Sequence, residues 1–481
     1  MRVLQVCSEF FPLLKTGGLA DVCAALPAAL AARGCDVRVL MPAFPALRAG
    51  LADAVPVATA FALPEGVRLL RGTLPEGSTG YLVEHPMYAQ GSNPYVDADG
   101  RPYADSHRRF ALLGRVAALV AEGLDAPWRP QVLHGHDWHA GLAPVYLRAA
   151  AARLQRRLCG SVFTVHNLAF QGVFPMTIRH GLGLPPEYFG LQGLEFYDQV
   201  SFMKGGLVYS DRLTTVSPTY AREIQGEEQG CGLDGVLRER SEDLVGILNG
   251  VDPAVWSPGA DAGIAQAYDA ADLSGKAACR RALQAEFGLA AQAEAPLFGI
   301  VSRLTDQKGV TLVLAGLDEM LRRGGQLVVL GSGDPALEAA LREAAAARPA
   351  SVALRLGYDE ALAHRIVAGA DAILVPSRFE PCGLTQLYGL RYGTLPLVRR
   401  VGGLADSVVD CSLENLGEGL ATGFVFDRFH VDDYLAAVRR AFTLHRRAED
   451  WRQVQASAMA QRFDWDAAAE QYLAVYRNVA L

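Results

Sequence analysis

The chain has 481 residues, of which 51% are hydrophobic and 20% are charged, and its formal net charge is −7. A chain of this length is too long for one core, and its composition is typical of a folded soluble protein, so we expect two large domains or three small ones. The negative charge argues against a nucleic-acid partner, because no basic run interleaved with aromatic residues offsets it.

The chain start, MRVLQVCSEF, is interrupted too early by polar residues to be a signal peptide. No apolar stretch reaches the roughly 18 residues that a membrane span needs, so we expect a cytoplasmic protein with no membrane partner. The eight cysteines are scattered without a CxxC or Cys/His spacing, which favours free thiols over disulfides or zinc.

The first predicted unit is a βαβ motif, with strands at 2–8 and 36–41 and a helix at 19–33. Its first loop reads KTGGLADV. Glycines allow close approach to a ligand, the helix start offers N–H groups, and Lys15 adds a mobile charge. This pattern favours close approach of a ligand to the loop. The alternative is an ordinary helix entry with a solvated lysine.

Residues 80–110 are rich in turn-forming residues, and we expect a surface loop with Tyr95 near its middle. Asp97 and Asp99 match the Asp-x-Asp pattern of metal-dependent sugar transferases. No strand is predicted directly before them, so a simple turn is the favoured interpretation.

The stretch QVLHGHDWHAG places several polar side chains after a predicted strand at 132–133. Metal binding is one interpretation of His134, His136, Asp137 and His139. These residues lack the i, i+4 spacing of a helical zinc site, so we expect no metal here. A polar pocket rim, with Asp137 accepting hydrogen bonds from hydroxyl groups, is favoured.

Strands and helices continue to alternate, with a strand at 161–167 that ends in His166 and Asn167. This alternation predicts a doubly wound domain over 1–245. Residues 246–258 carry the Gly, Asn-Gly, Asp-Pro and Ser-Pro signals of a linker, where we expect a hinge. A second α/β domain follows at 259–457, with predicted strands at 296–304, 326–330, 352–356 and 371–375.

The segment 371–408 gives an apolar strand, a polar turn, a helix near Leu384–Tyr392 and another strand. Glu380 and the N–H groups at this helix start suit sugar hydroxyls at the carboxyl edge of a parallel sheet. Arg303 and Lys308 follow the first strand of the same domain and match a diphosphate. Gly402 and Gly403 after the next strand predict a second phosphate-cradling turn. The alternatives are a helix cap and a surface pair that solvates a turn.

Seven motifs, in order along the chain, resemble the bacterial glycogen synthase family, with plastid starch synthases as near relatives. The motifs are KTGGLAD (15–21), HDWHAG (136–141), TVHN (164–167), NGVD (249–252), SRLTDQKG (302–309), FEPCGLTQLYGLRYGT (379–394) and GGLADSV (402–408). The resemblance implies an α/β protein of the GT-B fold, in which two Rossmann-like doubly wound domains face across a deep cleft. It also implies a final helix near 458–477 that returns to the first domain, so that 458–481 completes it.

The resemblance further implies retaining transfer of glucose from ADP-glucose to the 4-hydroxyl end of an α-1,4-glucan, without metal or cofactor. The implied catalytic residues are Glu380, Asp137, His166, Arg303 and Lys308. The implied substrate-binding residues are Lys15, Gly17, Gly18, Tyr95, Asn249, Tyr358, Cys382, Gly383, Leu384 and Thr385. Tyr358 is expected to stack on adenine. Tyr388 stands where many retaining relatives carry a second glutamate, so a ribose-binding carboxylate is not carried over.

Two competing interpretations are a non-catalytic binding protein and a phosphorylase or epimerase on the same fold. The first is expected to lack some of Lys15, Arg303, Lys308 and Glu380, and all four are present. The second needs a lysine that holds pyridoxal phosphate, or a different set of carboxylates, and neither is evident. The motif set, rather than the fold, therefore favours the glucosyltransferase.

Overall fold

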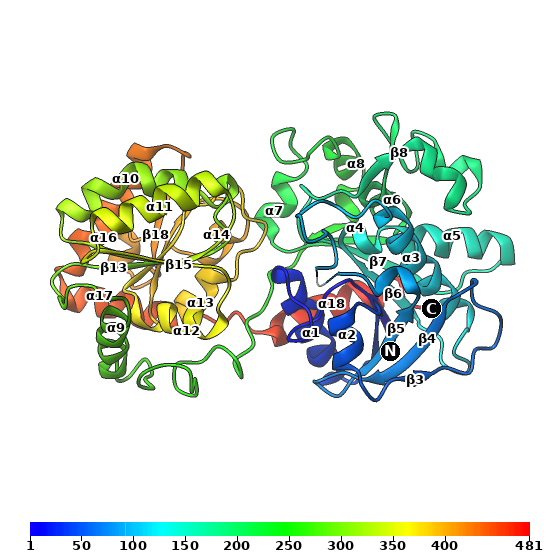
Figure 1. Ribbon diagram of the computed structural model, residues 1–481, viewed down its shortest axis with the longest axis horizontal. Coiled ribbons are helices and arrows are strands. Elements are labelled where there is room, and N and C mark those ends of the chain that lie inside the picture. The colour runs from blue at the N-terminus through cyan, green and yellow to red at the C-terminus, as the bar shows by residue number, and fades with distance from the viewer. Residues whose placement is uncertain (92) are drawn as a thin grey trace. The chain divides into compact units, whose positions relative to one another are not determined.

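The computed structural model describes residues 1–91 and 93–481 and contains two compact units. Unit 1 comprises Met1–Gly250 and Trp465–Leu481, and unit 2 comprises Val251–Asp464. Each unit is a sheet with helices packed against it (Figure 1). In the described part of the chain, none of the helices combines the length and the apolar character that a membrane crossing requires.

Unit 1 is built on a nine-stranded sheet in the order β12-β11-β7-β6-β1-β2-β5-β4-β3. The strands from β12 to β5 pair in parallel, and only β4 and β3 at one edge are antiparallel. The strands span β1 Arg2–Val6, β2 Asp36–Pro42, β3 Val55–Pro56, β4 Arg68–Thr73, β5 Thr79–Glu84, β6 Val132–His136, β7 Gly160–Val165, β11 Arg212–Thr215 and β12 Leu244–Gly246.

Helices of unit 1 alternate with these strands, as the doubly wound pattern requires. The longer ones are α1 Gly18–Ala31, α3 Ser106–Glu122, α5 Leu142–Leu154, α6 Phe202–Tyr209 and α18 Trp465–Arg477; the shorter are α2 Pro45–Gly50, α4 Asp137–Ala140, α7 Pro218–Glu223 and α8 Asp234–Glu239. A separate three-stranded sheet contains β8 Val173–Pro175, β9 Glu195–Phe196 and β10 Gln199–Ser201. Helix α18 packs against α1 in one hydrophobic cluster that includes Leu26 and Tyr472.

The prediction of a loop over 80–110 is wrong at both ends. Residues 79–84 form β5, whose apolar residues Tyr81, Leu82 and Val83 are fully buried between β2 and β4. Helix α3 already begins at Ser106. The strong turn signals at 91–103 hid the short apolar run that precedes them. The described residues between η1 (Pro86–Tyr88) and α3 lack long elements, and Asp97 accepts hydrogen bonds from the N–H groups of Asp99 and Arg101 in a simple turn.

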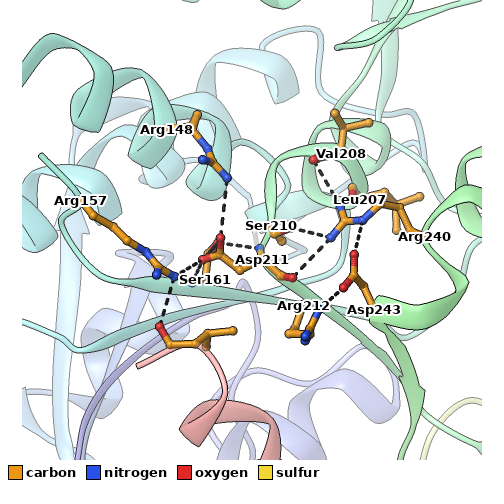
Figure 2. Close-up of polar contacts among 11 residues, drawn as sticks. Arg148, Arg157, Ser161, Leu207, Val208, Ser210, Asp211, Arg212, Arg240 and Asp243 are labelled. Atoms are coloured by element: carbon orange, nitrogen blue, oxygen red, sulfur yellow. Dashed lines mark hydrogen bonds and ion pairs between the residues drawn. The ribbon is translucent and has the colours of Figure 1, made fainter. Parts of the chain in front are cut away.

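A polar network fixes the corner of unit 1 where β7, α6 and β11 meet (Figure 2). Asp211 accepts hydrogen bonds from Ser161 N (2.8 Å) and Ser161 Oγ (3.0 Å), and Arg157 lies 3.1 Å from the same carboxylate. Arg240 donates to the carbonyl groups of Leu207 and Ser210 at the end of α6. These contacts satisfy the last carbonyls of a helix and hold the start of β11 beside β7, which sets the register of the strand that leads to His166.

Unit 2 contains a six-stranded parallel sheet in the order β15-β14-β13-β16-β17-β18. The strands are β13 Leu297–Val301, β14 Gln326–Gly331, β15 Val352–Leu356, β16 Ala372–Val375, β17 Leu395–Arg399 and β18 Phe424–Phe426. Counted within the unit, this order is 3-2-1-4-5-6, the order of the dinucleotide-binding Rossmann fold. The predicted strands of this domain are confirmed to within a few residues.

Helices lie on both faces of this sheet, α10 and α11 on one and α12 and α13 on the other (Figure 1). The helices of unit 2 are α9 Ser274–Phe287, α10 Val310–Arg322, α11 Pro335–Ala347, α12 Glu360–Gly369, α13 Thr385–Arg391, α14 Gly402–Ser407, α15 Leu413–Gly417, α16 Val431–His445 and α17 Ala448–Met459. The core between them is apolar and continuous, with Phe298, Ile373 and Leu397 fully buried.

The single final helix predicted at 458–477 is wrong. Helix α17 ends at Met459, and α18 begins only at Trp465. Between them, Phe463 O accepts a hydrogen bond from Val251 N at 2.7 Å, and Val251 pairs with Asp464 as a parallel bridge. The two stretches of chain that connect the units therefore pair with each other. The family resemblance implies a final helix but does not fix the residue at which it begins.

Candidate active site

In each unit, several of the predicted site residues follow the two strands at which the order of the sheet reverses: Lys15 and Asp137 in unit 1, and Lys308 and Glu380 in unit 2. In unit 1 these strands are β1 and β6, and in unit 2 they are β13 and β16. Crossovers leave in opposite directions on the two sides of such a point, which opens a crevice at the carboxyl ends of the strands. Strand order, which the sequence does not state, thus brings together residues that are far apart in the chain.

In unit 1, the loop after β1 is held by a buried glutamate that the sequence analysis missed. Glu9 is only 2% exposed. Its carboxylate accepts hydrogen bonds from Thr16 N (2.5 Å), Thr16 Oγ1 (2.6 Å) and Gly17 N (3.3 Å). Lys15 Nζ lies 3.0 Å from Asp21 Oδ1 on α1, and both side chains are 19% exposed. The KTGG loop is thus fixed before any ligand binds, with its lysine already beside one carboxylate.

Gly17 has open space on its side-chain side. Its φ of −164° is ordinary extended backbone, so no strain requires glycine here. A Cβ added at Gly17 would meet no atom within 4 Å, so tight packing does not require glycine either. Gly18 is the first residue of α1. The backbone at position 17 is therefore accessible from this side, and ligand binding there stays a prediction.

Tyr95 is tied to this loop rather than presented to solvent. Its hydroxyl donates to Glu9 Oε1 at 2.5 Å and lies 2.8 Å from Ser8 Oγ. Its ring stacks on His139 with centroids 4.5 Å apart. Burial, followed by the charge of Glu9, raises the pKa of Tyr95 well above its ordinary value, so the hydroxyl stays protonated. The structure places Tyr95 behind the Lys15 loop as a donor to Glu9.

Asp137 opens α4 immediately after β6 in a conformation unusual for a side chain of its kind. Its φ is +56°, and only 7% of its surface is exposed. Its Oδ1 accepts hydrogen bonds from His166 N (2.7 Å) and Asn167 N (3.4 Å), which joins the ends of β6 and β7. Burial raises the pKa of the carboxyl to about 7, against the lowering effect of these two donors. A left-handed, buried carboxylate at a strand end indicates a functional position.

The histidines around Asp137 are neutral. Burial lowers the pKa of His134, His139 and His166 to about 3 and that of His136 far below its ordinary value. His136 Nδ1 lies 3.0 Å from His166 Nε2, so one ring donates and the other accepts. His134 and His136 lie within β6, which runs beyond the predicted end at 133. Throughout residues 1–91 and 93–481, no group of three His, Cys, Asp or Glu side chains is placed to hold a metal ion.

In unit 2, Glu380 and Lys308 form a direct pair at the ends of β16 and β13. Lys308 Nζ lies 2.6 Å from Glu380 Oε2, and Ser377 Oγ donates to the same oxygen at 2.9 Å. The glutamate is 5% exposed. Arg378 N donates to Gln307 O at 2.8 Å, which joins the two loops through their backbones. A desolvated carboxylate and a lysine thus lie side by side at the crevice of the sheet.

Arg303 and Tyr358 lie at more exposed positions of the same edge. The Arg303 side chain is exposed and donates to Gln307 Oε1 at 3.3 Å. Tyr358, in the loop after β15, is 68% exposed. Both side chains are accessible to solvent at this edge of the sheet.

The turn over 380–385 is shaped by close backbone packing. Gly383 has a φ of +73°, and Gln386 Nε2 donates to the carbonyl groups of Cys382 and Gly383. Helix α13 follows with only seven residues, so its dipole is smaller than the predicted segment suggested. Thr385, its first residue, donates through Oγ1 to Val301 O at 3.3 Å.

The prediction that Gly402 and Gly403 form a second phosphate cradle does not fit their contacts. Gly403 N donates to the carbonyl groups of Glu380 and Pro381. A Cβ at Gly402 would lie 1.9 Å from Glu380 O, and one at Gly403 would lie 2.1 Å from Cys382 O. The two glycines let α14 press against the Glu380 turn, so their role is to support that turn.

A second feature that the sequence analysis missed is the packing of Trp256, near the end of the predicted hinge at 246–258, against unit 2. The Trp256 indole lies between the rings of His364 and Tyr388, 3.8 Å from each and nearly parallel to both. Arg391 Nε donates to Trp256 O at 2.8 Å. The segment after Val251 is therefore attached to α13, the helix that follows the Glu380 turn. Tyr388 has this stacking role in the structure.

Asn249 lies at the end of the first stretch of unit 1 and is 6% exposed. Among the described residues, no donor reaches its buried Oδ1. An unsatisfied buried acceptor is costly, by about 1 to 3 kcal/mol, and it is compatible with a ligand hydroxyl as the missing donor.

Comparison with known proteins identifies the family of the chain. A family model described as the starch synthase catalytic domain matches residues 2–239, and a model for group 1 glycosyl transferases matches residues 284–456. Glycogen synthase of Leptothrix cholodnii is 58% identical over 487 residues, with 100% of both chains covered. Glycogen synthase of Variovorax paradoxus is 58% identical over 490 residues, with 99% of each covered. The chain belongs to the glycogen and starch synthase family.

Solved structures extend the comparison to the fold. The catalytic domain of starch synthase IV from Arabidopsis thaliana, bound to ADP and acarbose, aligns with a TM-score of 0.88 at 31% identity over 99% of both chains. Sucrose-phosphate synthase from Thermosynechococcus elongatus aligns with a TM-score of 0.61 at 17% identity over 99% of this chain and 98% of that one. The predicted family and the predicted GT-B fold class are confirmed, and this member of the glycogen synthase family is a glycosyltransferase.

Proposed function

We propose that the chain transfers glucose from ADP-glucose to the non-reducing 4-hydroxyl end of an α-1,4-glucan, with retention of configuration, during glycogen biosynthesis in the cytoplasm. The observation that carries this proposal is the Glu380–Lys308 pair at the crevice of unit 2. The carboxylate suits the hydroxyls of a glucose ring, and the lysine beside it suits the diphosphate attached to that ring. ADP bound to the Arabidopsis relative supports the nucleotide.

The charges present on the chain match those that develop in this reaction. When the C1–O bond to ADP breaks, negative charge collects on the diphosphate and positive charge on the sugar. Lys15, Arg303 and Lys308 serve the diphosphate in this proposal. Three such cations supply the stabilisation that a metal gives in other transferases, and we expect activity to persist in a strong chelator. Loss of activity that added Mg²⁺ restores would overturn this part.

On the sugar side, Asp137 and His166 are proposed to face the reacting carbon, and Glu380 to hold glucose hydroxyls together with the N–H groups of Cys382, Gly383 and Leu384. The acceptor oxygen attacks C1 from the side that ADP leaves, and its proton passes to the departing phosphate oxygen. The alternative is a covalent glucosyl ester on Asp137. A carboxyl with a pKa of about 7 is only partly ionised at neutral pH, which disfavours it as a nucleophile.

The remaining predicted contacts complete the two substrates. Tyr358 is proposed to stack on adenine, and 68% of its surface is exposed. The N–H groups near Gly17 and Gly18 are proposed to approach the diphosphate. Further contacts with the sugars are proposed for Asn249 and Thr385, and Tyr95 is proposed to act through Glu9 on the Lys15 loop.

We also propose that residues 1–245 and 458–481 form the acceptor side, that 259–457 form the nucleotide-sugar side, and that 246–258 act as a hinge. Sites on both units then require closure around the donor. Small-angle scattering should show a smaller radius of gyration with ADP and maltoheptaose than without them. An unchanged radius would argue against closure.

One assay tests the function itself. Purified protein should release ADP from ADP-glucose only when glycogen or a malto-oligosaccharide is present, and the product should carry a new α-1,4-linked glucose. UDP-glucose in a parallel reaction measures donor strictness. ADP-glucose binding without glucose transfer would instead favour a non-catalytic binding protein.

A further inference from the structure

An exposed aromatic surface lies in unit 1 beside the Asp137 site. Phe170 and Tyr197 are 51% and 74% exposed, whereas most aromatic rings of the chain are buried. Phe170 lines a shallow pocket of about 360 Å³, and Tyr197 follows Phe196, which also lines it. The pocket is lined by Trp138, Ala169, Phe170, Gln171, Gly172, Val173 and Phe196. We refer to the rings of Phe170, Phe196 and Tyr197 as the aromatic platform.

The backbone presents Tyr197 in a conformation that its side chain disfavours. Strands β9 and β10 are joined by the two-residue turn Tyr197–Asp198, and both residues have positive φ, +49° and +61°. Such a turn normally takes Asn-Gly or similar residues, and a bulky side chain there is strained. The Phe196 ring meets the Tyr197 ring edge-on at 4.8 Å. Neither packing nor turn geometry explains an exposed tyrosine at this position, which points to a role in binding.

The platform is continuous with the residues around Asp137. Trp138 follows Asp137 directly, and Gly172, at φ +58°, lies so close that an added Cβ would be 2.1 Å from Trp138 Cε3. Glycine therefore allows the segment 169–173 to lie flat against the indole. Gln171 Nε2 donates to Cys231 O at 2.8 Å. At Gly232 an added Cβ would lie 3.2 Å from both the Phe196 and Tyr197 rings, so the 231–232 backbone supports the platform from below.

The chemistry of this surface fits a neutral sugar chain. The pocket lining contains the Gln171 amide and no lysine or arginine, and two carboxylates, Glu195 and Asp198, belong to β9 and the turn that follows it. Anions such as nucleotides or phosphates would be repelled, whereas glucose rings offer apolar faces for stacking and hydroxyls for the polar groups. We propose that the platform binds the glucose units of the α-1,4-glucan acceptor that lie beyond its reacting end.

This inference rests on the proposed function, because that function supplies the glucan and places its reacting end near Asp137. It adds a site that selects for chain length. A short acceptor reaches Asp137 without touching Tyr197, whereas a long acceptor gains the platform contacts. The kinetic signature is therefore a Michaelis constant that depends on acceptor length through these rings.

The decisive variant is Tyr197→Asn, because asparagine accepts positive φ and removes the ring. We expect the KM for maltoheptaose to rise about tenfold, and that for maltotriose less than twofold, with a melting temperature no lower than that of the parent. Tyr197→Trp should restore the parental KM. Phe61→Ala, at an aromatic residue of unit 1 that is 37% exposed and lies elsewhere, is the matched control. An equal KM for maltoheptaose in the parent and in Tyr197→Asn would overturn the proposal.

A second measurement is independent of turnover. Cys231 is the exposed cysteine, and the other seven are buried. Maltoheptaose should slow alkylation of Cys231 by N-ethylmaleimide several-fold in the parent, measured by mass spectrometry of its peptide, but not in Tyr197→Asn. Equal rates with and without the sugar would overturn the platform. Protection that instead follows protein concentration would assign the surface to a second copy of the chain, and it would also overturn the proposal. If protection occurs but no ADP is ever released with glycogen, the proposed function fails while the binding site stands.

Discussion

The two buried carboxylates of the candidate site lie in opposite electrostatic surroundings. Asp137 in unit 1 is held by two backbone N–H groups among neutral histidines, and burial raises its pKa to about 7. Glu380 in unit 2 has the Lys308 ammonium 2.6 Å away and the Ser377 hydroxyl 2.9 Å away. Both follow strands at the reversal point of their sheets. Equivalent positions in the two sheets therefore hold a partly ionised carboxyl group, Asp137, in unit 1 and a carboxylate paired with a lysine, Glu380, in unit 2.

The difference indicates that the two units stabilise different charges of the reaction. Unit 1 keeps charge low where the sugar would develop positive charge, and Asp137 is the group that can supply a negative charge there. Unit 2 keeps cations near the position proposed for the diphosphate. Unit 1 should accordingly be sensitive to pH, and unit 2 to the loss of single charged side chains.

The largest effect is expected from Glu380→Ala. Loss of the carboxylate removes the proposed hydrogen bonds to glucose and leaves Lys308 without its partner, so kcat should fall about a thousandfold, or roughly 4 kcal/mol, while the KM for ADP-glucose changes little. Steady-state kinetics with saturating glycogen measure both. Asp306→Ala is the control, because Asp306 pairs with Arg378 in the neighbouring loop but is 63% exposed. A kcat within threefold of the parent would remove Glu380 from the site.

Acid should loosen unit 1 before unit 2. The buried histidines of β6, β7 and α4 have folded pKa values near 3 or lower, below the ordinary 6.5, so the stability they contribute is present above pH 6.5 and lost as pH falls below it. The raised pKa of Asp137 has the opposite effect on stability: between about pH 7 and pH 4, the folded unit gains stability from this group as pH falls. This single group opposes four histidines. The net loss is on the order of a few kcal/mol over the first pH unit below 6.5.

Hydrogen exchange followed by mass spectrometry at pH 7.5 and 5.5, corrected for intrinsic rates, tests this expectation. Peptides that cover β6 and β7 should lose protection, and those that cover β13 and β16 should keep it. Equal losses in both sheets would show that the contrast between the units has no thermodynamic consequence.

The sequence predicted most of the strands and much of the candidate site. The end of an apolar run indicates both where a strand ends and which polar side chain follows it. An apolar run that stops at His166, or at the polar turn before Glu380, marks a strand and places a side chain at its carboxyl edge. The contacts that the sequence did not predict mostly join residues that are far apart in the chain. Glu9 meets Tyr95 across 86 residues, and Trp256 stacks on Tyr388 in a helix more than a hundred positions away, so no local pattern could announce either contact.

Two local errors have physical causes as well. The strand β5 was hidden because its six residues precede a long run of turn formers, and composition over a wide window follows the longer segment. Gly402 and Gly403 match the pattern of a phosphate cradle because glycine serves both close ligand approach and close backbone packing. The 1.9 Å and 2.1 Å separations that a Cβ would have from the Glu380 turn decide for packing.

Asp137→Asn should reduce kcat/KM about a hundredfold at pH 8, or nearly 3 kcal/mol, because the amide cannot supply the negative charge. The parental rate should rise as pH increases through about 7, where the buried carboxyl ionises, and the Asn variant should lack this rise. Glu9 is the other carboxylate whose charge reaches Asp137, so Glu9→Gln should shift the midpoint downward while leaving a rise. A parental profile that is flat between pH 6 and 8 would mean that the ionisation of Asp137 does not control the rate.

The smallest effect is expected from Lys15→Gln, which tests whether a cation of unit 1 serves the diphosphate. The KM for ADP-glucose should rise about tenfold, or 1.4 kcal/mol, with kcat within threefold, because a single flexible charge is lost from binding. Asp21 provides the sharper comparison, since its carboxylate lies 3.0 Å from Lys15 Nζ and competes with any incoming phosphate. If Lys15 changes partner when the donor binds, Asp21→Asn should leave the KM unchanged or lower it. A higher KM in Asp21→Asn, equal to that of Lys15→Gln, would mean that the pair acts as a fixed unit and that Asp21 holds the lysine in place.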